Sequence, residues 1–202
     1  DNAVIDKLNK KHVPIKYVEK HELDRLVEGN HQGIVFKVDD YKYVDIESLL
    51  VKENPLLVIL DHLEDPHNFG AIIRTCEAAG VDGIIIPKNR TVEVNSTVMR
   101  TSVGALDNVK IAQVTNLKNT INYLKKQGFW IVGTDMDGTD YTKIDYTGKM
   151  AIVTGSEGFG MSRIVRESCD FIATIPMKGK VNSLNASVAT AIVIYEAIKG
   201  RN

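Results

Sequence analysis

The stretch LLVILDHLEDPHNFGAIIRTCEAAGVDGIIIP, residues 56–87, contains two short apolar runs with a helical pattern between them. The runs LLVIL (56–60) and GIIIP (83–87) do not alternate apolar with polar residues, which is typical of strands buried on both faces. Residues 68–79 have apolar side chains at helical spacing. This order of strand, helix and strand predicts a parallel β-α-β unit.

The same order continues along the rest of the chain. Further apolar runs lie at 109–114, 129–134, 151–155 and 171–176, and further helical segments lie at 95–102, 116–127, 161–168 and 184–199. The prediction is an α/β fold in which a parallel sheet has helices on both faces. Ligands bind such sheets beyond the carboxyl ends of the strands, so the loops that follow the strands are the candidate sites.

Residues 1–40 have a different pattern, that of the back half of a small α/β module. Helices are expected at AVIDKLNKKH (3–12) and HELDRLVEG (21–29, closed by Gly29), and short strands at VPIKYV (13–18) and GIVFKV (33–38). Residues 41–54 form a polar connector with room for one helical turn. The expected organisation is therefore a module at 1–40, a linker at 41–54 and the sheet domain at 55–202.

The composition is that of an ordinary globular protein, with 44% hydrophobic and 25% charged residues. The net charge of −1 gives no overall basic field, so any binding of nucleic acid must use local patches. No apolar run approaches the roughly 20 residues of a membrane span, and no N-terminal targeting signal is visible. We therefore expect a cytoplasmic location, no membrane association and two unpaired thiols, Cys76 and Cys169.

The loop and helix at 61–80 follow the first apolar run of the sheet domain. Asn68 is placed to cap the helix, a common structural role, or to belong to a ligand site. Arg74 stands among apolar residues, where a guanidinium needs a phosphate or carboxylate partner. The cluster Asp61, His62, Glu64, Asp65 and His67 fits no zinc spacing, so we expect no metal.

The loop TGSEGFGMSR (154–163) has three glycines in the spacing G-x-x-G-x-G. Its backbone N–H groups are suited to a phosphate or an adenosine, and a plain turn into the next helix is the alternative. The spacing is not the dinucleotide-binding G-x-G-x-x-G. The carboxylate of Glu157 in the middle of the loop argues against a phosphate.

The segment IPMKGKVNSLNASVATAIVIYEAIK (175–199) places a polar loop directly before the most apolar helix of the chain. Either Ser183 or Asn185 is able to cap this helix, but one cap does not explain both residues and the two nearby lysines. The helix is apolar on nearly every side, which indicates burial within the fold or in a subunit interface and favours an oligomer.

Three long motifs in these loops, DPHNFGAIIRTCEAAG, IVTGSEGFGMS and IPMKGKVNSLNASVATAI, resemble in sequence and order the signatures of the SpoU branch of the SPOUT-class RNA ribose 2′-O-methyltransferases. The resemblance covers about residues 55–200. It implies methyl transfer from S-adenosylmethionine to a ribose 2′-hydroxyl of structured RNA, a C-terminal trefoil knot and a homodimer. Residues 1–40 resemble the second half of the L30e-like RNA-binding domain of the 23S rRNA guanosine 2′-O-methyltransferases, which favours rRNA over tRNA and a guanosine target.

The resemblance also implies roles for individual residues. The implied catalytic residues are Arg74, Asn68, Glu157, Ser183 and Asn185. The implied cofactor-binding residues are Thr134, Gly155, Ile175, Met177, Ser183 and Leu184. The cations expected to contact RNA are Arg74, Lys88, Arg90, Arg100, Lys178 and Lys180. Because a guanidinium is almost never deprotonated, we expect Arg74 to clamp a phosphate and stabilise the developing alkoxide, with Glu157 as its ion-pair partner.

Two other classes of protein remain as alternatives. A Rossmann-type nucleotide enzyme would carry a glycine fingerprint after its first strand, and LDHLEDPHNFG (60–70) supplies none. A non-catalytic RNA-binding protein that keeps the fold would be free to lose the polar set around Asn68 and Arg74. An assay of methyl transfer separates these alternatives.

Overall fold

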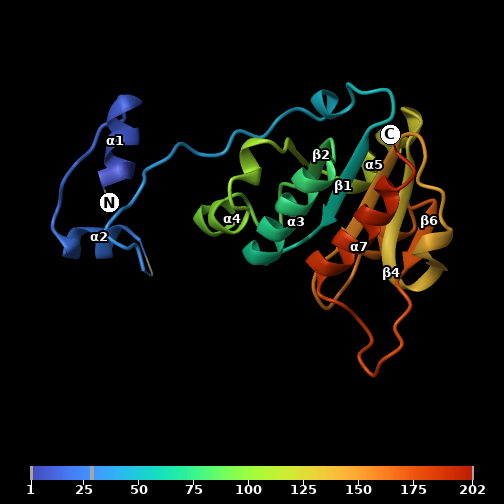
Figure 1. The fold of residues 1–202 in the computed structure, drawn as a ribbon. Coiled ribbons are helices and arrows are strands. Elements are labelled where there is room, and N and C mark those ends of the chain that lie inside the picture. Colours follow the sequence, from blue (N-terminus) through green and yellow to red (C-terminus); the bar gives the residue numbers. More distant parts are fainter. Residues whose placement is uncertain (1, 28–29, 202) are drawn as a thin grey trace. The chain divides into compact units, whose positions relative to one another are not determined.

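The computed structural model describes residues 2–27 and 30–201 (Figure 1). The chain divides into two compact units, residues 1–40 and residues 41–202. The first unit contains the helices α1 (Asn2–Lys10) and α2 (Lys20–Leu26), as expected. Gly29, which was expected to end the second helix, lies outside the described residues. No helix in the described part of the chain is long and apolar enough to cross a membrane.

The two strands expected in the first unit do not form. Residues 13–18 and 34–38 have no regular secondary structure, and the side chains of Tyr17 and Phe36 are exposed. A strand needs a neighbouring strand to pair its N–H and C=O groups, and the described residues of this unit provide none. The prediction from the apolar pattern was therefore wrong for these two segments.

The second unit contains a sheet and the helices that cover it. Its strands are β1 (Leu56–Asp61), β2 (Gly83–Pro87), β3 (Ile111–Val114), β4 (Trp130–Asp140), β5 (Met150–Gly155) and β6 (Phe171–Thr174). Its α-helices are α3 (Pro66–Ala79), α4 (Ser96–Thr101), α5 (Leu117–Lys126), α6 (Arg163–Arg166) and α7 (Ala186–Ile198). Three short 3₁₀ helices are η1 (Ile46–Leu49), η2 (Ala105–Asp107) and η3 (Tyr141–Lys143). Every strand expected from residue 56 onward is present.

The six strands form one sheet in the order β3-β2-β1-β5-β4-β6, and each neighbouring pair is parallel. The central pair, β1 and β5, runs in register from Leu56 opposite Met150 to Asp61 opposite Gly155. The prediction of a parallel α/β sheet is therefore confirmed. All the strands end at the same edge, so the loops at 61–65, 155–162 and 175–185 begin there.

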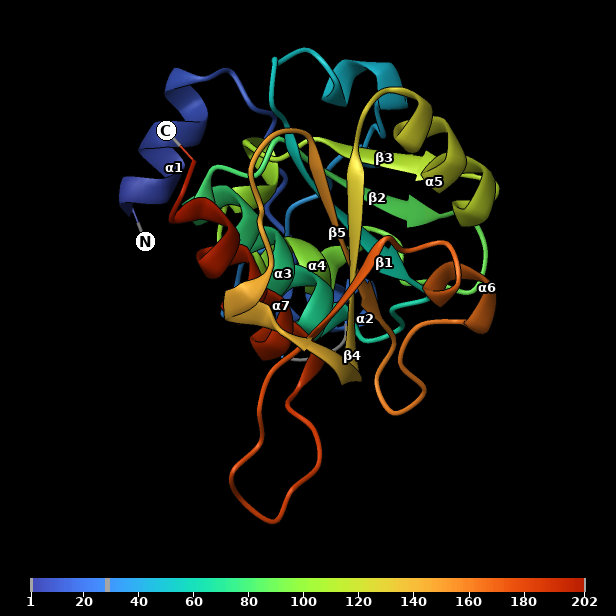
Figure 2. The ribbon, with the colours of Figure 1, turned by 90° about the vertical axis from the view of Figure 1, so that its right-hand side faces the viewer.

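Helices cover both faces of this sheet, which explains why the strands are apolar without alternation. Val58 and Leu60 of β1 point into a core shared with Phe69 of α3 and residues of α7. Leu57 of β1 points to the opposite side, where its core includes Ile121 of α5. Figure 2 shows α3 and α7 on one side of the sheet and α5 and α6 on the other.

Residues 41–54, expected to be a linker, pack against the sheet domain. Val44 pairs with Ala112 beside β3, and the hydroxyl of Tyr41 donates a hydrogen bond to the carbonyl of Val109 at 3.1 Å. Leu49 of η1 is buried in the core on the α5 side. Apolar side chains within this polar segment therefore make it part of the second unit.

Strand β4 is longer than the expected 129–134. It pairs with β6 at Thr134 and again at Thr139, and both residues lie opposite Ala173. Residues 135–138 therefore form a bulge in the strand. At the other end of β4, the ring of Trp130 packs on Phe171 of β6 with 5.6 Å between ring centroids.

Candidate active site

The N-terminus of α3 brings the first motif to the carboxyl edge of the sheet. Asp65 caps this helix, because its side chain accepts a hydrogen bond from the N–H of His67 at 2.8 Å, and Pro66 occupies the first turn. The sequence left Asn68 open as the cap of this helix or as part of a ligand site, and the structure excludes the cap. Asn68 lies inside the first turn, where it is only 6% exposed and its side-chain amide is free for other partners.

Asn68 joins the second and third motifs through its two amide atoms. Its Nδ2 donates to Oε1 of Glu157 at 2.5 Å, and its Oδ1 accepts from Nδ2 of Asn185 at 3.0 Å. Glu157 and Asn185 are 89 and 117 residues away in sequence. The fold thus brings together three of the five residues that the resemblance implies to be catalytic.

Asn185 has two functions at the start of α7. Its Oδ1 accepts hydrogen bonds from the backbone N–H groups of Ser187 and Val188 at 2.9 and 3.3 Å, which makes it the N-cap. Its Nδ2 remains available for Asn68. The sequence left Ser183 and Asn185 open as caps, and the structure selects Asn185. Ser183 lies in the exposed loop and makes no hydrogen bond to the other implied catalytic residues among those described.

The glycine-rich loop holds Glu157 in place. Ser156 and Gly160 exchange two backbone hydrogen bonds, each of 3.0 Å, across the base of the loop. A Cβ on Gly155 would lie 2.0 Å from the carbonyl carbon of Gly160, so only glycine permits this close approach. At the tip of the loop Phe159 is 94% exposed. The loop is therefore fixed at its base and presents an aromatic ring to solvent.

Asp61 ties the other end of this loop to the sheet. This buried residue is the last of β1, and its Oδ2 accepts a hydrogen bond from the N–H of Ser162 at 2.6 Å. Its Oδ1 lies 2.5 Å from Nδ1 of His62. From the sequence, Asp61 was considered only as a candidate metal ligand. Its position directly after a fully apolar strand was the signal of a structural role at the site.

Metal binding finds no support in the described residues. In 2–27 and 30–201, no three histidine, cysteine, aspartate or glutamate side chains are grouped to hold a metal ion. Asp61 and Asp65, both in the cluster considered above, instead accept hydrogen bonds from backbone N–H groups. Both cysteines are free, and burial raises the pKa of the Cys169 thiol to about 12.

Arg74 is exposed, and the expected ion pair with Glu157 does not form. Within the described chain, Arg74 has neither a hydrogen bond nor an ion pair. It lies six residues after Asn68, and at about 100° per residue this places the two side chains on different faces of α3. Its apolar sequence neighbours Ile73 and Cys76 point into the core instead. The guanidinium is thus free to meet a phosphate.

The other cations expected to contact RNA are also exposed. Lys88 and Arg90 follow β2, Arg100 lies on α4, and Lys178 and Lys180 lie in the loop before α7. Figure 2 shows this loop extending beyond the carboxyl edge of the sheet. These positions fit a dispersed basic surface around the edge that holds Asn68.

Three of the residues implied to bind the cofactor lie in, at the end of or directly after three adjacent strands, β4, β5 and β6. Gly155 ends β5, Thr134 pairs with Ala173 of β6, and Ile175 comes directly after β6. The hydroxyl of Thr134 donates to the carbonyl of Val153 at 3.2 Å, which joins β4 to β5. Met177, Ser183 and Leu184 lie in the extended loop, and no hydrogen bond joins them to these three residues in the described chain.

Comparison with known proteins identifies two regions of the chain. Residues 55–195 match the model of the SpoU rRNA methylase family. Residues 1–44 match a model described as RNA 2′-O ribose methyltransferase substrate binding. A putative TrmH family tRNA/rRNA methyltransferase, YacO of Bacillus subtilis strain 168, is 45% identical over 205 residues, which cover 98% of this chain and 82% of the relative.

Solved structures that are similar to this one include two enzymes of the SpoU type. The SpoU methyltransferase AviRb from Streptomyces viridochromogenes, in complex with AdoMet, is 30% identical with a TM-score of 0.74, over 79% of this chain and 66% of that chain. The TrmH/SpoU tRNA modifying enzyme of A. aeolicus is 34% identical with a TM-score of 0.68, over 77% of this chain and 79% of that chain.

Proposed function

The chain belongs to the SpoU rRNA methylase family of RNA methyltransferases, and from this we propose that it transfers a methyl group from S-adenosylmethionine to a ribose 2′-hydroxyl in structured RNA. S-adenosylmethionine is the cofactor of this family, and the similar AviRb structure contains it. The match of residues 1–44 to a substrate-binding model of RNA 2′-O ribose methyltransferases supports the ribose 2′-oxygen as the acceptor.

The residues implied to bind the cofactor fit its chemistry. S-adenosylmethionine supplies a methyl group activated by a sulfonium, whose positive charge disappears on transfer. A wall of apolar side chains and neutral polar groups suits such a molecule better than a basic pocket. Ile175, Leu184, Thr134 and Gly155 form a set of this kind, and the apolar side chain of Leu184 is exposed where a ligand would cover it.

The hydrogen-bonded group of Glu157, Asn68 and Asn185 is the observation that carries the proposal. In the proposed reaction the ribose 2′-oxygen gains the methyl group and its proton passes to solvent. Glu157, Asn185 and the nearby Ser183 orient the ribose, and Asn68 fixes the first two. Arg74 clamps the adjacent phosphate and stabilises the alkoxide character that develops on the 2′-oxygen.

Ribosomal RNA, and within it a guanosine of 23S rRNA, is the substrate we favour. The description of the matching family as rRNA methylases supports this choice. The similar A. aeolicus enzyme, described as tRNA-modifying, favours tRNA as the second candidate. The exposed cations Lys88, Arg90, Arg100, Lys178 and Lys180 would contact phosphates, so binding should weaken steeply as salt is raised.

We further propose a cytoplasmic homodimer whose C-terminal segment forms the trefoil knot of the SPOUT fold. The support for a dimer is α7, which is not buried on every side in the single chain. Val188 and Tyr195 are 47% and 49% exposed, and the partly exposed Ala191 and Ile192 lie between them at helical spacing. A second subunit would cover this apolar stripe.

The experiment that tests the proposal measures transfer of labelled methyl from S-adenosylmethionine to rRNA and tRNA that lack the modification. The wild type is compared with Arg74→Ala and with Arg163→Ala, a control because Arg163 is an exposed arginine paired with Glu167 outside the site. We expect label on a ribose 2′-oxygen of rRNA, lost only in the first variant. Label on tRNA would select the second candidate, and the absence of any transfer would refute the proposal.

A further inference from the structure

The bulge in β4 lies directly beside the proposed cofactor site. It begins after Thr134 and ends before Thr139, so residues 135–138 leave the ladder that pairs β4 with β6. A bulge loses ladder hydrogen bonds, and its shape must therefore be set by other contacts. At Gly138 an added Cβ would lie 2.3 Å from the carbonyl oxygen of Ile172, so the bulge packs closely on β6.

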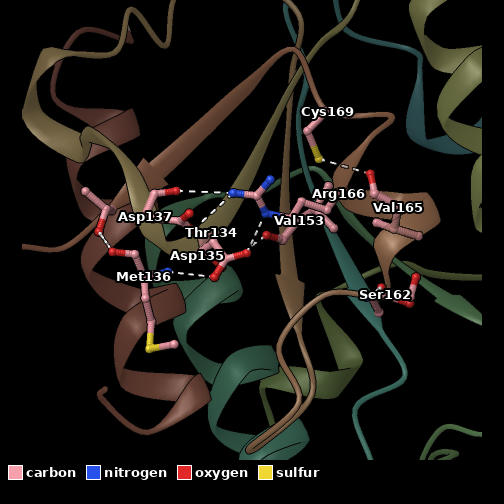
Figure 3. A network of polar contacts seen from close by, with 11 residues as sticks. Thr134, Asp135, Met136, Asp137, Val153, Ser162, Val165, Arg166 and Cys169 are labelled. Atoms are coloured by element: carbon pink, nitrogen blue, oxygen red, sulfur yellow. Dashed lines mark hydrogen bonds and ion pairs between the residues drawn. The ribbon is translucent and has the colours of Figure 1, made fainter. Parts of the chain in front are cut away.

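Arg166 of α6 holds this bulge from the side (Figure 3). Its Nε donates to Oδ2 of Asp135 at 2.8 Å, and its Nη2 donates to Oδ1 of Asp137 at 3.1 Å. The two carboxylates flank Met136, whose N–H donates to Asp135 and whose carbonyl accepts from the hydroxyl of Thr174 at 2.8 Å. One guanidinium therefore fixes both sides of a four-residue bulge.

The position of Arg166 in the chain connects this bulge to the glycine-rich loop. α6 begins one residue after Ser162, whose N–H is bound to Asp61, and the backbone N–H of Arg166 donates to the carbonyl of Ser162 at 2.9 Å. The segments that Arg166 joins are those carrying Thr134 and Gly155, two of the implied cofactor-binding residues. In addition to the pairing of β4 with β5, Arg166 thus links the bulge that follows Thr134 to the glycine-rich loop that follows Gly155.

We propose that Arg166 is a positioning residue for S-adenosylmethionine, which sets the β4 bulge against the glycine-rich loop. This inference rests on the proposed function. Asp135 and Asp137 carry two negative charges against the one positive charge of Arg166, so the group as a whole does not repel a sulfonium, and the role of Arg166 is to hold the two carboxylates and with them the bulge. Without the guanidinium the two carboxylates would repel each other and open the bulge.

The test compares the binding of S-adenosylmethionine, which carries a sulfonium charge, with that of S-adenosylhomocysteine, which does not. Calorimetric titration is carried out on the wild type, Arg166→Gln and the matched control Arg163→Gln, whose side chain pairs with Glu167 on the same short helix. For Arg166→Gln we expect both dissociation constants to rise by the same factor, about 3- to 30-fold, as for the loss of one or two charge-assisted contacts. The control should stay within about twofold of the wild type.

Kinetics and a second variant separate positioning from a general loss of structure. At saturating cofactor Arg166→Gln should keep its kcat while the KM for S-adenosylmethionine rises. Asp135→Asn weakens the same contact without altering α6, and should raise both dissociation constants by a smaller factor while the melting temperature stays near that of the wild type.

Three results would overturn the inference, and they are distinguishable. If Arg166→Gln and Asp135→Asn both bind the two molecules as tightly as the wild type does, the contact between Arg166 and Asp135 does not position the cofactor. The proposed function would not be affected by this result. If Arg166→Gln changes the dissociation constant of S-adenosylmethionine but not that of S-adenosylhomocysteine, Arg166 acts on the sulfonium charge and not on the position of the cofactor. Failure of the wild type to bind either molecule would refute the proposed function, and the inference with it.

Discussion

Replacing Asn68 by aspartate is the sharpest perturbation of the hydrogen-bonded group at the site. The change is nearly isosteric and keeps an oxygen that can accept from Nδ2 of Asn185. It replaces the Nδ2 donor with a carboxylate oxygen, which faces Oε1 of Glu157 at the position now 2.5 Å away. A hydrogen bond is thereby exchanged for a contact between two carboxylates.

The geometry sets the size of the effect on stability. At an effective dielectric constant of about 20, two unit charges 2.5 Å apart repel by about 6–7 kcal/mol. Holding a proton on a carboxyl with an ordinary pKa near 4 costs about 4 kcal/mol at pH 7 and about 1.4 kcal/mol at pH 5. Protonation of one carboxylate costs less than the repulsion between two charged ones, so the pair will bind a proton. The protonation costs of about 4 kcal/mol at pH 7 and about 1.4 kcal/mol at pH 5 are therefore upper limits on the loss of stability.

The sign of the pH dependence follows from the raised pKa of the carboxylate pair in the folded variant. The destabilisation of the variant relative to the wild type has its full size above that pKa. It shrinks as the pH falls towards about 4, where these carboxyl groups begin to be protonated in the unfolded chain as well. Urea unfolding of the wild type and Asn68→Asp at pH 7 and pH 5 measures this difference. Asn68→Ala is the control, and its loss of about 1–3 kcal/mol should be nearly the same at both pH values. An equal loss at both pH values for Asn68→Asp would refute the reasoning.

Three further predictions concern the loop, a thiol and the last helix. Gly155→Ala should cost about 1–3 kcal/mol of unfolding free energy, because the new Cβ would lie 2.0 Å from the carbonyl carbon of Gly160. The control Gly179→Ala should be close to neutral, because a Cβ there would have nothing within 4 Å. An equal loss of unfolding free energy in the two variants, measured by urea unfolding, would contradict this account. Burial raises the pKa of the Cys169 thiol to about 12, so iodoacetamide at pH 8 should label this thiol slowly in the folded protein and fast in urea. Mass spectrometry measures the labelling, and rapid labelling of Cys169 in the folded protein would show that the thiol is not buried. Tyr195→Glu should halve the mass found by light scattering if α7 forms the proposed dimer interface, whereas an unchanged dimer mass would exclude this face.

The sheet could be predicted from the sequence because each parallel strand is covered on both faces. In a strand such as LLVIL (56–60) no side chain faces solvent, so every position is apolar and the pattern is continuous. The runs at 13–18 and 33–38 are also mostly apolar, although each contains a lysine. A strand further needs a neighbouring strand for its backbone groups, and composition does not report a neighbour. The bulge at 135–138 escaped prediction because its polar residues are those of an ordinary loop.

The candidate site could be predicted only as a set of loops. Loops that follow parallel strands meet at one edge, and the resemblance implied that Asn68, Glu157 and Asn185 belong to one catalytic set. The pattern did not show which atoms bond. It offered Asn68 as one candidate for the cap of α3 and did not offer Asp65, which was considered only as a metal ligand. Arg74 was expected to need a partner because its sequence neighbours are apolar, but on a helix adjacent residues point to different faces, and its side chain is exposed.

The contact between Trp130 and Phe171 provides the molecule with an optical reporter. Trp130 is the only tryptophan of the chain, is 53% exposed, and packs on the first residue of β6. Release of β6 from β4 would leave the indole ring wholly in water and shift its emission to longer wavelength. Because β6 leads into the loop at 175–185 and then into α7, one fluorescence signal would follow the attachment of the entire C-terminal segment during folding.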